Sequence, residues 1–158
     1  MKKIICCLLV AVMLSACGGE SKQENAPRKE GEKRVGDIIM VNGELGVVFA
    51  VTTDGQHGKV MSVTEASYMN WSHALAWCSN LGSSWHLPTR EDLMIIYSKK
   101  KLIDFVLSAN GYTTISDVRY WSSESYEKTC AWYVHMRYGR NSTTPKDDGT
   151  FVRAVSVF

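Results

Sequence analysis

Four histidines are the side chains whose chemistry could support acid–base catalysis or metal binding: His57, His73, His86 and His135. None of them lies in an H-E-x-x-H pattern, and the chain has no pair of C-x-x-C motifs, so no zinc site is predicted. Serines are frequent, but none lies in the G-x-S-x-G pattern of a nucleophile elbow. We therefore expect a protein that is not an enzyme and that carries no cofactor or metal.

The N-terminal residues 1–16 have the pattern of an export signal. Two lysines precede an apolar run over residues 4–14, which as a helix would be too short to cross a bilayer. The next residues, Leu14-Ser15-Ala16-Cys17, resemble a bacterial lipobox. This resemblance implies cleavage before Cys17, acylation of its thiol and a lipid-anchored protein, whereas a plain secretory signal is the alternative. Because Gly18 and not an acidic residue follows, we expect the outer membrane.

The chain has 18 basic and 16 acidic residues. Cleavage before Cys17 would remove Lys2 and Lys3, so the mature chain would have no formal net charge. Nucleic-acid binding needs a concentrated basic surface, so we expect no nucleic-acid partner. After the cysteine, residues 17–34 contain no large apolar side chain, which predicts a flexible tether. Residues 35–158 are then expected to form a single domain.

The order of predicted elements indicates the fold class. Apolar residues spaced by three and four predict a helix over 71–81. Thr89, followed three residues later by Asp92, predicts the cap of a second helix that reaches residue 110. Runs rich in β-branched and aromatic residues predict strands at 38–41, 45–52, 59–63, 120–123, 131–136 and 151–158. Strands, two helices and strands again predict an α+β domain, with a mainly antiparallel sheet and both helices packed to one side.

Four motifs carry a family resemblance: Trp85-His86-Leu87-Pro88-Thr89, Tyr120-Trp121-Ser122-Ser123, Ala131-Trp132-Tyr133-Val134 and Phe151-Val152-Arg153-Ala154-Val155. In this order they resemble the Lcl C-terminal-type domain, a bacterial family of the C-type-lectin-like group, over residues 35–158. The resemblance implies a C-type-lectin-like fold on a cell-surface protein, and some such proteins are adhesins for matrix or polyanionic glycans. Ala154 stands where members often carry a cysteine, so no disulfide to this strand is expected.

Cys78 and Cys130 are the cysteines that remain if Cys17 is acylated and residues 1–16 are removed. In an oxidising envelope compartment, two thiols predict one disulfide bridge. Two buried free thiols are one alternative. A redox site is the other, although such sites usually have a C-x-x-C motif.

Residues 139–149 are polar and predict a long loop, and recognition residues commonly lie on loops that a rigid scaffold holds. The candidate ligand-binding residues in and before this loop are Arg137, Tyr138, Arg140, Asn141, Asp147 and Asp148. The last three could supply oxygen ligands to calcium, although an acidic solvated turn is the favoured interpretation. Elsewhere, Trp121 and Trp132 are expected in the core, and Arg153 is expected to pair with Glu91 or Glu124.

The sequence thus predicts a lipid-anchored envelope protein that binds a glycan, matrix or surface-protein ligand without catalysis. One alternative is a structural accessory subunit of a surface assembly. A divergent enzyme of the formylglycine-generating type is a further alternative, and it would need a reactive thiol at Cys78 or Cys130.

Overall fold

Two helices and nine strands make up residues 29–158, the part of the chain that the computed structural model describes. In chain order the elements are β1 (Ile38–Val41), β2 (Glu44–Val51), β3 (Gly58–Ser62), β4 (Ala66–Met69), α1 (Trp71–Asn80), α2 (Arg90–Ala109), β5 (Arg119–Tyr126), β6 (Cys130–His135), β7 (Arg140–Pro145), β8 (Thr150–Val152) and β9 (Val155–Val157). The predicted signal, Cys17 and most of the tether lie outside the described residues. Within those residues, no helix is long and apolar enough to span a membrane.

The strands divide into two sheets, in the orders β1-β2-β3-β9 and β4-β8-β5-β6-β7. All pairs are antiparallel except β5 with β8, which meet at Tyr120 and Phe151. The predicted last strand, 151–158, is divided at Arg153-Ala154, so that β8 joins one sheet and β9 the other. The predicted α+β class is therefore confirmed, with two sheets where the sequence suggested one.

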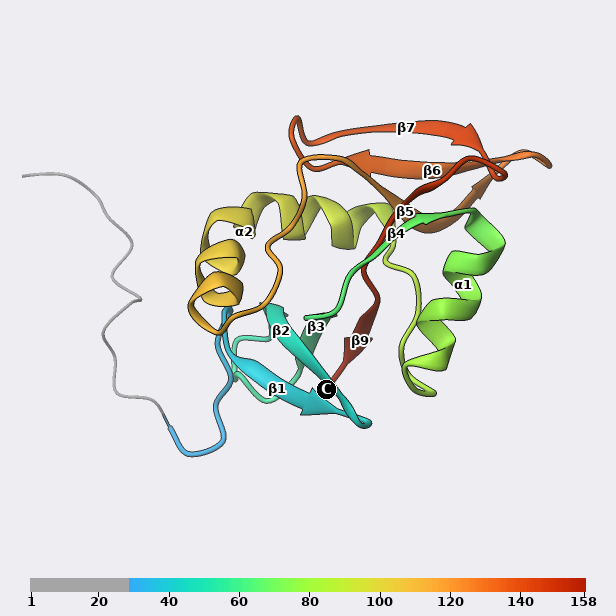
Figure 1. Cartoon of the computed structure of the whole chain (residues 1–158). Coiled ribbons are helices and arrows are strands. Elements are labelled where there is room, and N and C mark those ends of the chain that lie inside the picture. Colours follow the sequence, from blue (N-terminus) through green and yellow to red (C-terminus); the bar gives the residue numbers. More distant parts are fainter. Residues whose placement is uncertain (1–28) are drawn as a thin grey trace, which may run out of the picture.

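Helix α2 lies between the two sheets, as Figure 1 shows. It begins where the sequence predicts: the Thr89 hydroxyl accepts a hydrogen bond from the Asp92 amide at 3.1 Å, and the Asp92 carboxylate accepts one from the Thr89 amide at 3.0 Å. Its buried apolar residues pack against β2, β3, β5, β6 and β9 in the larger core cluster. These helix residues are Leu93, Ile96, Ile103 and Leu107.

Helix α1 packs against a second core cluster that contains Trp85 and Trp121. The helix buries Ala74 and Cys78, whereas Leu75, predicted on the inward face, is 37% exposed. Both tryptophan rings are buried, and each indole N–H donates to a backbone carbonyl. The prediction for Trp121 is thus confirmed. The prediction for Trp132 was wrong: this residue is only half-buried and belongs to neither core cluster, and its ring lies against Arg90 and Tyr126.

Arg153 lies in the bend between β8 and β9 and is 1% exposed. It does not pair with Glu91 or Glu124: its Nε donates to Glu65 at 3.1 Å, and Glu124 pairs with Arg90. Its remaining donors reach four backbone carbonyls, those of Ser62, Val63, Thr113 and Thr114, at 2.6–3.2 Å. The guanidinium therefore joins three segments that are distant in sequence.

We expect Arg153→Met to lower the free energy of unfolding by about 3–5 kcal/mol, because it leaves the buried Glu65 carboxylate and four carbonyls without their donor. Arg153→Lys should recover little, since an ammonium cannot reproduce the planar fork of donors. Urea unfolding measures both. The matched control is Arg90→Met, which removes a partly exposed pair with Glu124 and should cost less than about 1 kcal/mol. Equal effects of the two methionine variants would contradict the assignment.

Asp92 gives the fold an acid-sensitive contact. Burial would raise the pKa of its carboxyl, but hydrogen bonds from Lys59 and Thr89 outweigh burial and hold the pKa below its ordinary value. A lowered folded-state pKa stabilises the fold above the unfolded-state pKa of about 3.9, and this stability is lost as the pH falls further.

We therefore expect Asp92→Asn to lower the stability at pH 7 by about 1–2 kcal/mol, through the lost cap and ion pair, and to flatten the fall in stability between about pH 4 and pH 2. Unfolding curves across pH measure both effects. Asp147→Asn is the control, because this exposed carboxylate has no hydrogen bond or ion pair within residues 29–158 that would be lost. If the stability of Asp92→Asn fell with acid as steeply as that of the parent protein, the proposed role of this carboxyl in acid sensitivity would be refuted.

Candidate functional site

The predicted loop at 139–149 is mostly a strand. Residues Arg140–Pro145 form β7, which pairs with β6 along its whole length, from His135↔Arg140 to Cys130↔Pro145. The prediction of a long loop was wrong because a polar strand at the edge of a sheet lacks the apolar alternation that marks strands with one buried face. Only short turns remain, at 136–139 and 146–149.

The six predicted ligand-binding residues therefore separate into two groups. Arg137, Tyr138, Arg140 and Asn141 lie at or near the turn that precedes β7, whereas Asp147 and Asp148 follow its other end. Asp148 accepts a hydrogen bond from the Thr144 hydroxyl within its own turn. Asn141 is thus at the opposite end of β7 from the two aspartates. Among residues 29–158 no group of three or more His, Cys, Asp or Glu side chains is placed to hold a metal ion.

The register of the second sheet brings together a different set of side chains. Arg119 on β5 pairs with His135 on β6, and His135 pairs with Arg140 on β7, so the three form one row across the sheet. Directly paired residues project from the same face. Tyr133 is two residues before His135 and lies on that face as well. The Arg119 guanidinium carbon is 5.3 Å from the centre of the Tyr133 ring.

The turn after β6 extends this row. The Tyr138 ring lies against His135, with ring centres 4.7 Å apart, and the guanidinium carbon of Arg137 is 5.5 Å from the Tyr138 ring centre. Tyr138 is 57% exposed, and Arg137 and Arg140 are exposed as well. We call this surface the arginine face and define it by six residues: Arg119, Tyr133, His135, Arg137, Tyr138 and Arg140.

Gly139 shapes the turn that presents this face. Its backbone is left-handed, with φ +61°, and a Cβ there would lie 2.3 Å from a ring carbon of Tyr97 on α2. Both facts require glycine, so the turn can rest directly on the helix. The positions of Arg137 and Arg140 are fixed in this way by the scaffold beneath them.

The arginine face is a concentrated source of unneutralised positive charge. Within the described residues, none of its three arginines forms an ion pair or a side-chain hydrogen bond with a protein oxygen. Arginine presents a planar fork of donors that suits carboxylate, sulfate or phosphate groups, and the tyrosine rings beside it offer apolar faces. The surface can therefore bind an anionic ligand that also has stacking surfaces.

An open pocket of about 170 Å³ adjoins this face and shares Arg119 and His135 with it. Its other lining residues are Tyr68, Val118, Gly149, Thr150 and Phe151. Sites that enclose a whole small molecule usually have about 300–1,000 Å³. This pocket can accept one group of a larger ligand.

Sequence reasoning identified Arg137, Tyr138 and Arg140 but missed Arg119, Tyr133 and His135. Arg119 lies far from the turn in sequence, and only the strand register places it beside the turn. Tyr133 and His135 precede the turn on β6 and lie on the same face as Arg119. One sequence signal could have indicated Arg119: it precedes the buried Tyr120 on a predicted strand, so its side chain must point to the other face of the sheet.

The predicted disulfide does not form, and Cys78 and Cys130 are free thiols. Cys78 and Ala131 belong to the same buried cluster. Because successive residues of a strand point to opposite faces, Cys130 is directed away from Ala131 and thus away from Cys78. Burial raises the pKa of Cys78 to about 12, so its reactive thiolate form is scarce at neutral pH.

Three comparisons relate the chain to known proteins. The sequence profile of the family described as "Lcl C-terminal domain" matches residues 49–156. No curated protein matches the sequence significantly. Among solved structures, botrocetin is similar with a TM-score of 0.40 and 19% identity, over 62% of this chain and 90% of that one. EMS16, an antagonist of the collagen receptor integrin α2β1, is similar with a TM-score of 0.42 and 9% identity, over 66% and 94%.

We expect the two thiols to differ in reactivity. In the native protein, Cys130→Ser should remove the thiol that reacts with Ellman's reagent in minutes, whereas Cys78→Ser should leave that signal unchanged. In denaturant, each variant should lose one equivalent relative to the parent protein, because Cys78 is then exposed. Loss of the native signal in Cys78→Ser would contradict its burial.

Proposed function

The chain belongs to the Lcl C-terminal domain family, and from this premise we propose that it is a lipid-anchored envelope protein that binds an anionic glycan or matrix polymer. Family membership and element content agree with the expected C-type-lectin-like α+β fold. A fold of this group suits a binding module. The ligand class is argued from the arginine face.

The observation that carries the proposal is that Arg119, Arg137 and Arg140 lie together without acidic partners among the residues that the structure describes. Such guanidinium groups form charge-assisted hydrogen bonds with sulfate or carboxylate groups. The rings of Tyr133 and Tyr138 beside them can cover the apolar face of a sugar ring. A polymer with repeated anionic groups would engage several of these arginines at once and place one group in the adjoining pocket.

The lipid anchor rests on the lipobox-like residues 14–17. Two or more acyl chains hold a protein firmly at a membrane, where a single chain binds only marginally. Intact-mass spectrometry of the mature protein tests this step directly, because acylation of Cys17 adds a defined mass that Cys17→Ala would abolish. The outer membrane is the location that we propose.

A structural accessory role is the second candidate, since β7 is the outer strand of its sheet. Five of the six residues of β7 are polar and the sixth is Pro145, a composition that protects an edge from pairing with another chain. This favours ligand binding at the arginine face over strand addition. The formylglycine-type enzyme has less support, because burial disfavours the thiolate of Cys78 and strand alternation directs Cys130 away from the cluster that holds Cys78.

We expect the full-length mature protein to bind dextran sulfate and to ignore unsulfated dextran. The variant Arg119→Gln/Arg137→Gln/Arg140→Gln should bind dextran sulfate at least tenfold more weakly, a loss of about 1.4 kcal/mol or more. Immobilised polysaccharide and surface plasmon resonance measure the affinity.

The matched control changes three other exposed cations, Lys99, Lys101 and Lys128, to Gln, which alters the net charge equally. It should change the affinity less than threefold. Equal losses in the two triple variants would show non-specific attraction, and a folded protein that fails to bind dextran sulfate would favour the accessory role.

A further inference from the structure

Helix α2 carries an exposed apolar surface in its C-terminal half. Phe105 is 71% exposed and Leu102 is 44% exposed, whereas Ile103 and Leu107 of the same turns are buried. Residues three and four apart are neighbours on a helix, so Leu102, Phe105 and the exposed Ala109 form one continuous stripe. We call these three residues the apolar stripe. The side of a surface helix that faces solvent is normally polar.

The three lysines near the stripe differ in their ion pairs and in the direction that they face. Lys100 turns away from it and pairs with Asp104 at 2.7 Å and Asp117 at 3.3 Å. Lys99 and Lys101 are exposed, form no ion pair with any residue of 29–158, and flank the stripe on its two sides. An apolar face bordered by lysines is typical of helices that lie in the interface of an anionic membrane, with the lysine stems extended along the apolar region.

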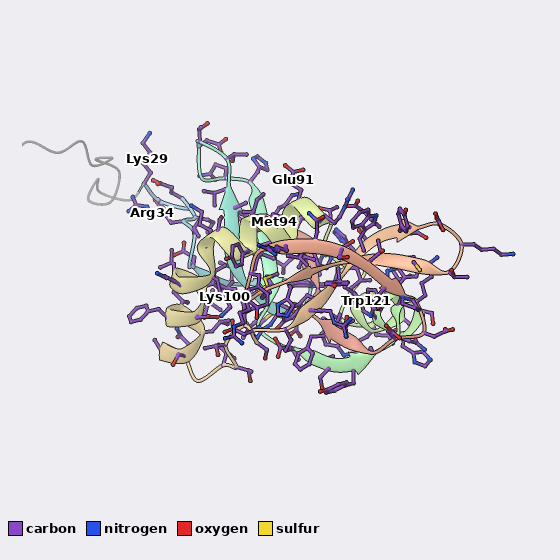
Figure 2. All side chains as sticks on the ribbon, turned by 90° about the horizontal axis from the view of Figure 1, so that it is seen from above. Lys29, Arg34, Glu91, Met94, Lys100 and Trp121 are labelled. Atoms are coloured by element: carbon purple, nitrogen blue, oxygen red, sulfur yellow. The ribbon has the colours of Figure 1, made fainter. Side chains whose placement is uncertain are left out.

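The N-terminal segment approaches the domain beside this surface. A Cβ placed on Gly36 would be 3.3 Å from Val106 and 3.8 Å from Leu102, so the chain passes against the same turns of α2. Figure 1 shows the segment that starts at residue 29 beside the C-terminal end of α2. In Figure 2, Lys29 and Arg34 lie at the same end of the molecule as Lys100 and away from Trp121.

The length of chain before Lys29 limits how far this end can lie from an anchor. Cys17 is twelve residues earlier in the sequence. A chain spans at most about 3.3–3.6 Å per residue, so the distance between the two residues cannot exceed roughly 40 Å. An acylated Cys17 would therefore keep the α2 end of the domain close to the lipid surface.

We propose that the apolar stripe, with Lys99 and Lys101, docks the domain onto the anionic membrane that holds its own anchor. This inference rests on the lipid anchor proposed above. Phe105 and Leu102 would enter the region between headgroups and acyl chains, and the two lysines would contact anionic headgroups. The arginine face lies on the side of the second sheet opposite to α2, because Tyr133 and His135 alternate with Val134 and Met136, which pack in the α2 cluster. Docking would thus leave it open to ligand.

The test places an environment-sensitive dye on the stripe of the lipidated full-length protein. Phe105→Cys is labelled in a Cys130→Ser background, in which Cys78 is buried. Tyr126→Cys, at a residue that is 42% exposed at the end of β5 opposite to Arg119, is the matched control. On vesicles that contain phosphatidylglycerol, we expect a blue shift of the dye emission and quenching by nitroxide lipids at residue 105 and neither at residue 126.

Replacing phosphatidylglycerol by phosphatidylcholine, or introducing Lys99→Glu/Lys101→Glu, should remove most of the shift, whereas Lys128→Glu should not. Vesicle flotation is followed in the same samples. Flotation without a shift at residue 105 overturns docking and leaves the anchor standing, and absence of flotation overturns both. A shift in vesicle-free detergent that grows with protein concentration would show that a second copy covers the stripe, which also overturns the proposal.

Discussion

The structure depends on one buried guanidinium. Arg153 sits where the chain leaves the second sheet and enters the first, and its donors satisfy Glu65 together with carbonyls from the segment after β3 and from the segment before β5. A buried charge is tolerated only where it is paired and fully hydrogen-bonded, and the described side chains include no buried polar atom without a partner. Glu65 in turn accepts hydrogen bonds from Tyr120 and Ser116, so the same cluster holds the beginning of β5 in place.

The contacts of Arg153 also affect the arginine face, because they fix how the strands of the second sheet align. With β8 fixed by the bend at Arg153, Phe151 pairs with Tyr120 in parallel, and β5 aligns with β6 so that Arg119 faces His135. The pocket between β4, β5 and β8 is a product of the same alignment. On the other side, Gly139 rests on Tyr97 of α2 and sets the turn that carries Arg137 and Tyr138. Charges that repel one another are thus held together by a scaffold whose own polar groups are satisfied elsewhere.

Local signals predicted the local structure well. The cap formed by Thr89 and Asp92 marked the start of α2, and the apolar runs marked β1, β2 and β3. What failed depended on contacts between distant residues. The division of residues 151–158 into two strands depends on the contacts of Arg153 with Glu65 and Thr113. Whether Cys78 meets Cys130 depends on which face of β6 packs in the cluster that contains Cys78. The candidate site was half identified for the same reason: Arg137 and Arg140 are near in sequence, but Arg119 joins them only through strand register.

The pairing of β3 with β9 has a consequence for how the chain is made. Residues 59–61 pair with β2 on one side, but their partners on the other side are residues 155–157, and α2 packs between sheets that are both completed by the last third of the chain. Contacts of such large sequence separation form late in folding. The core therefore cannot close before the last residues of the chain are available, which would keep the chain unfolded during the export that we propose.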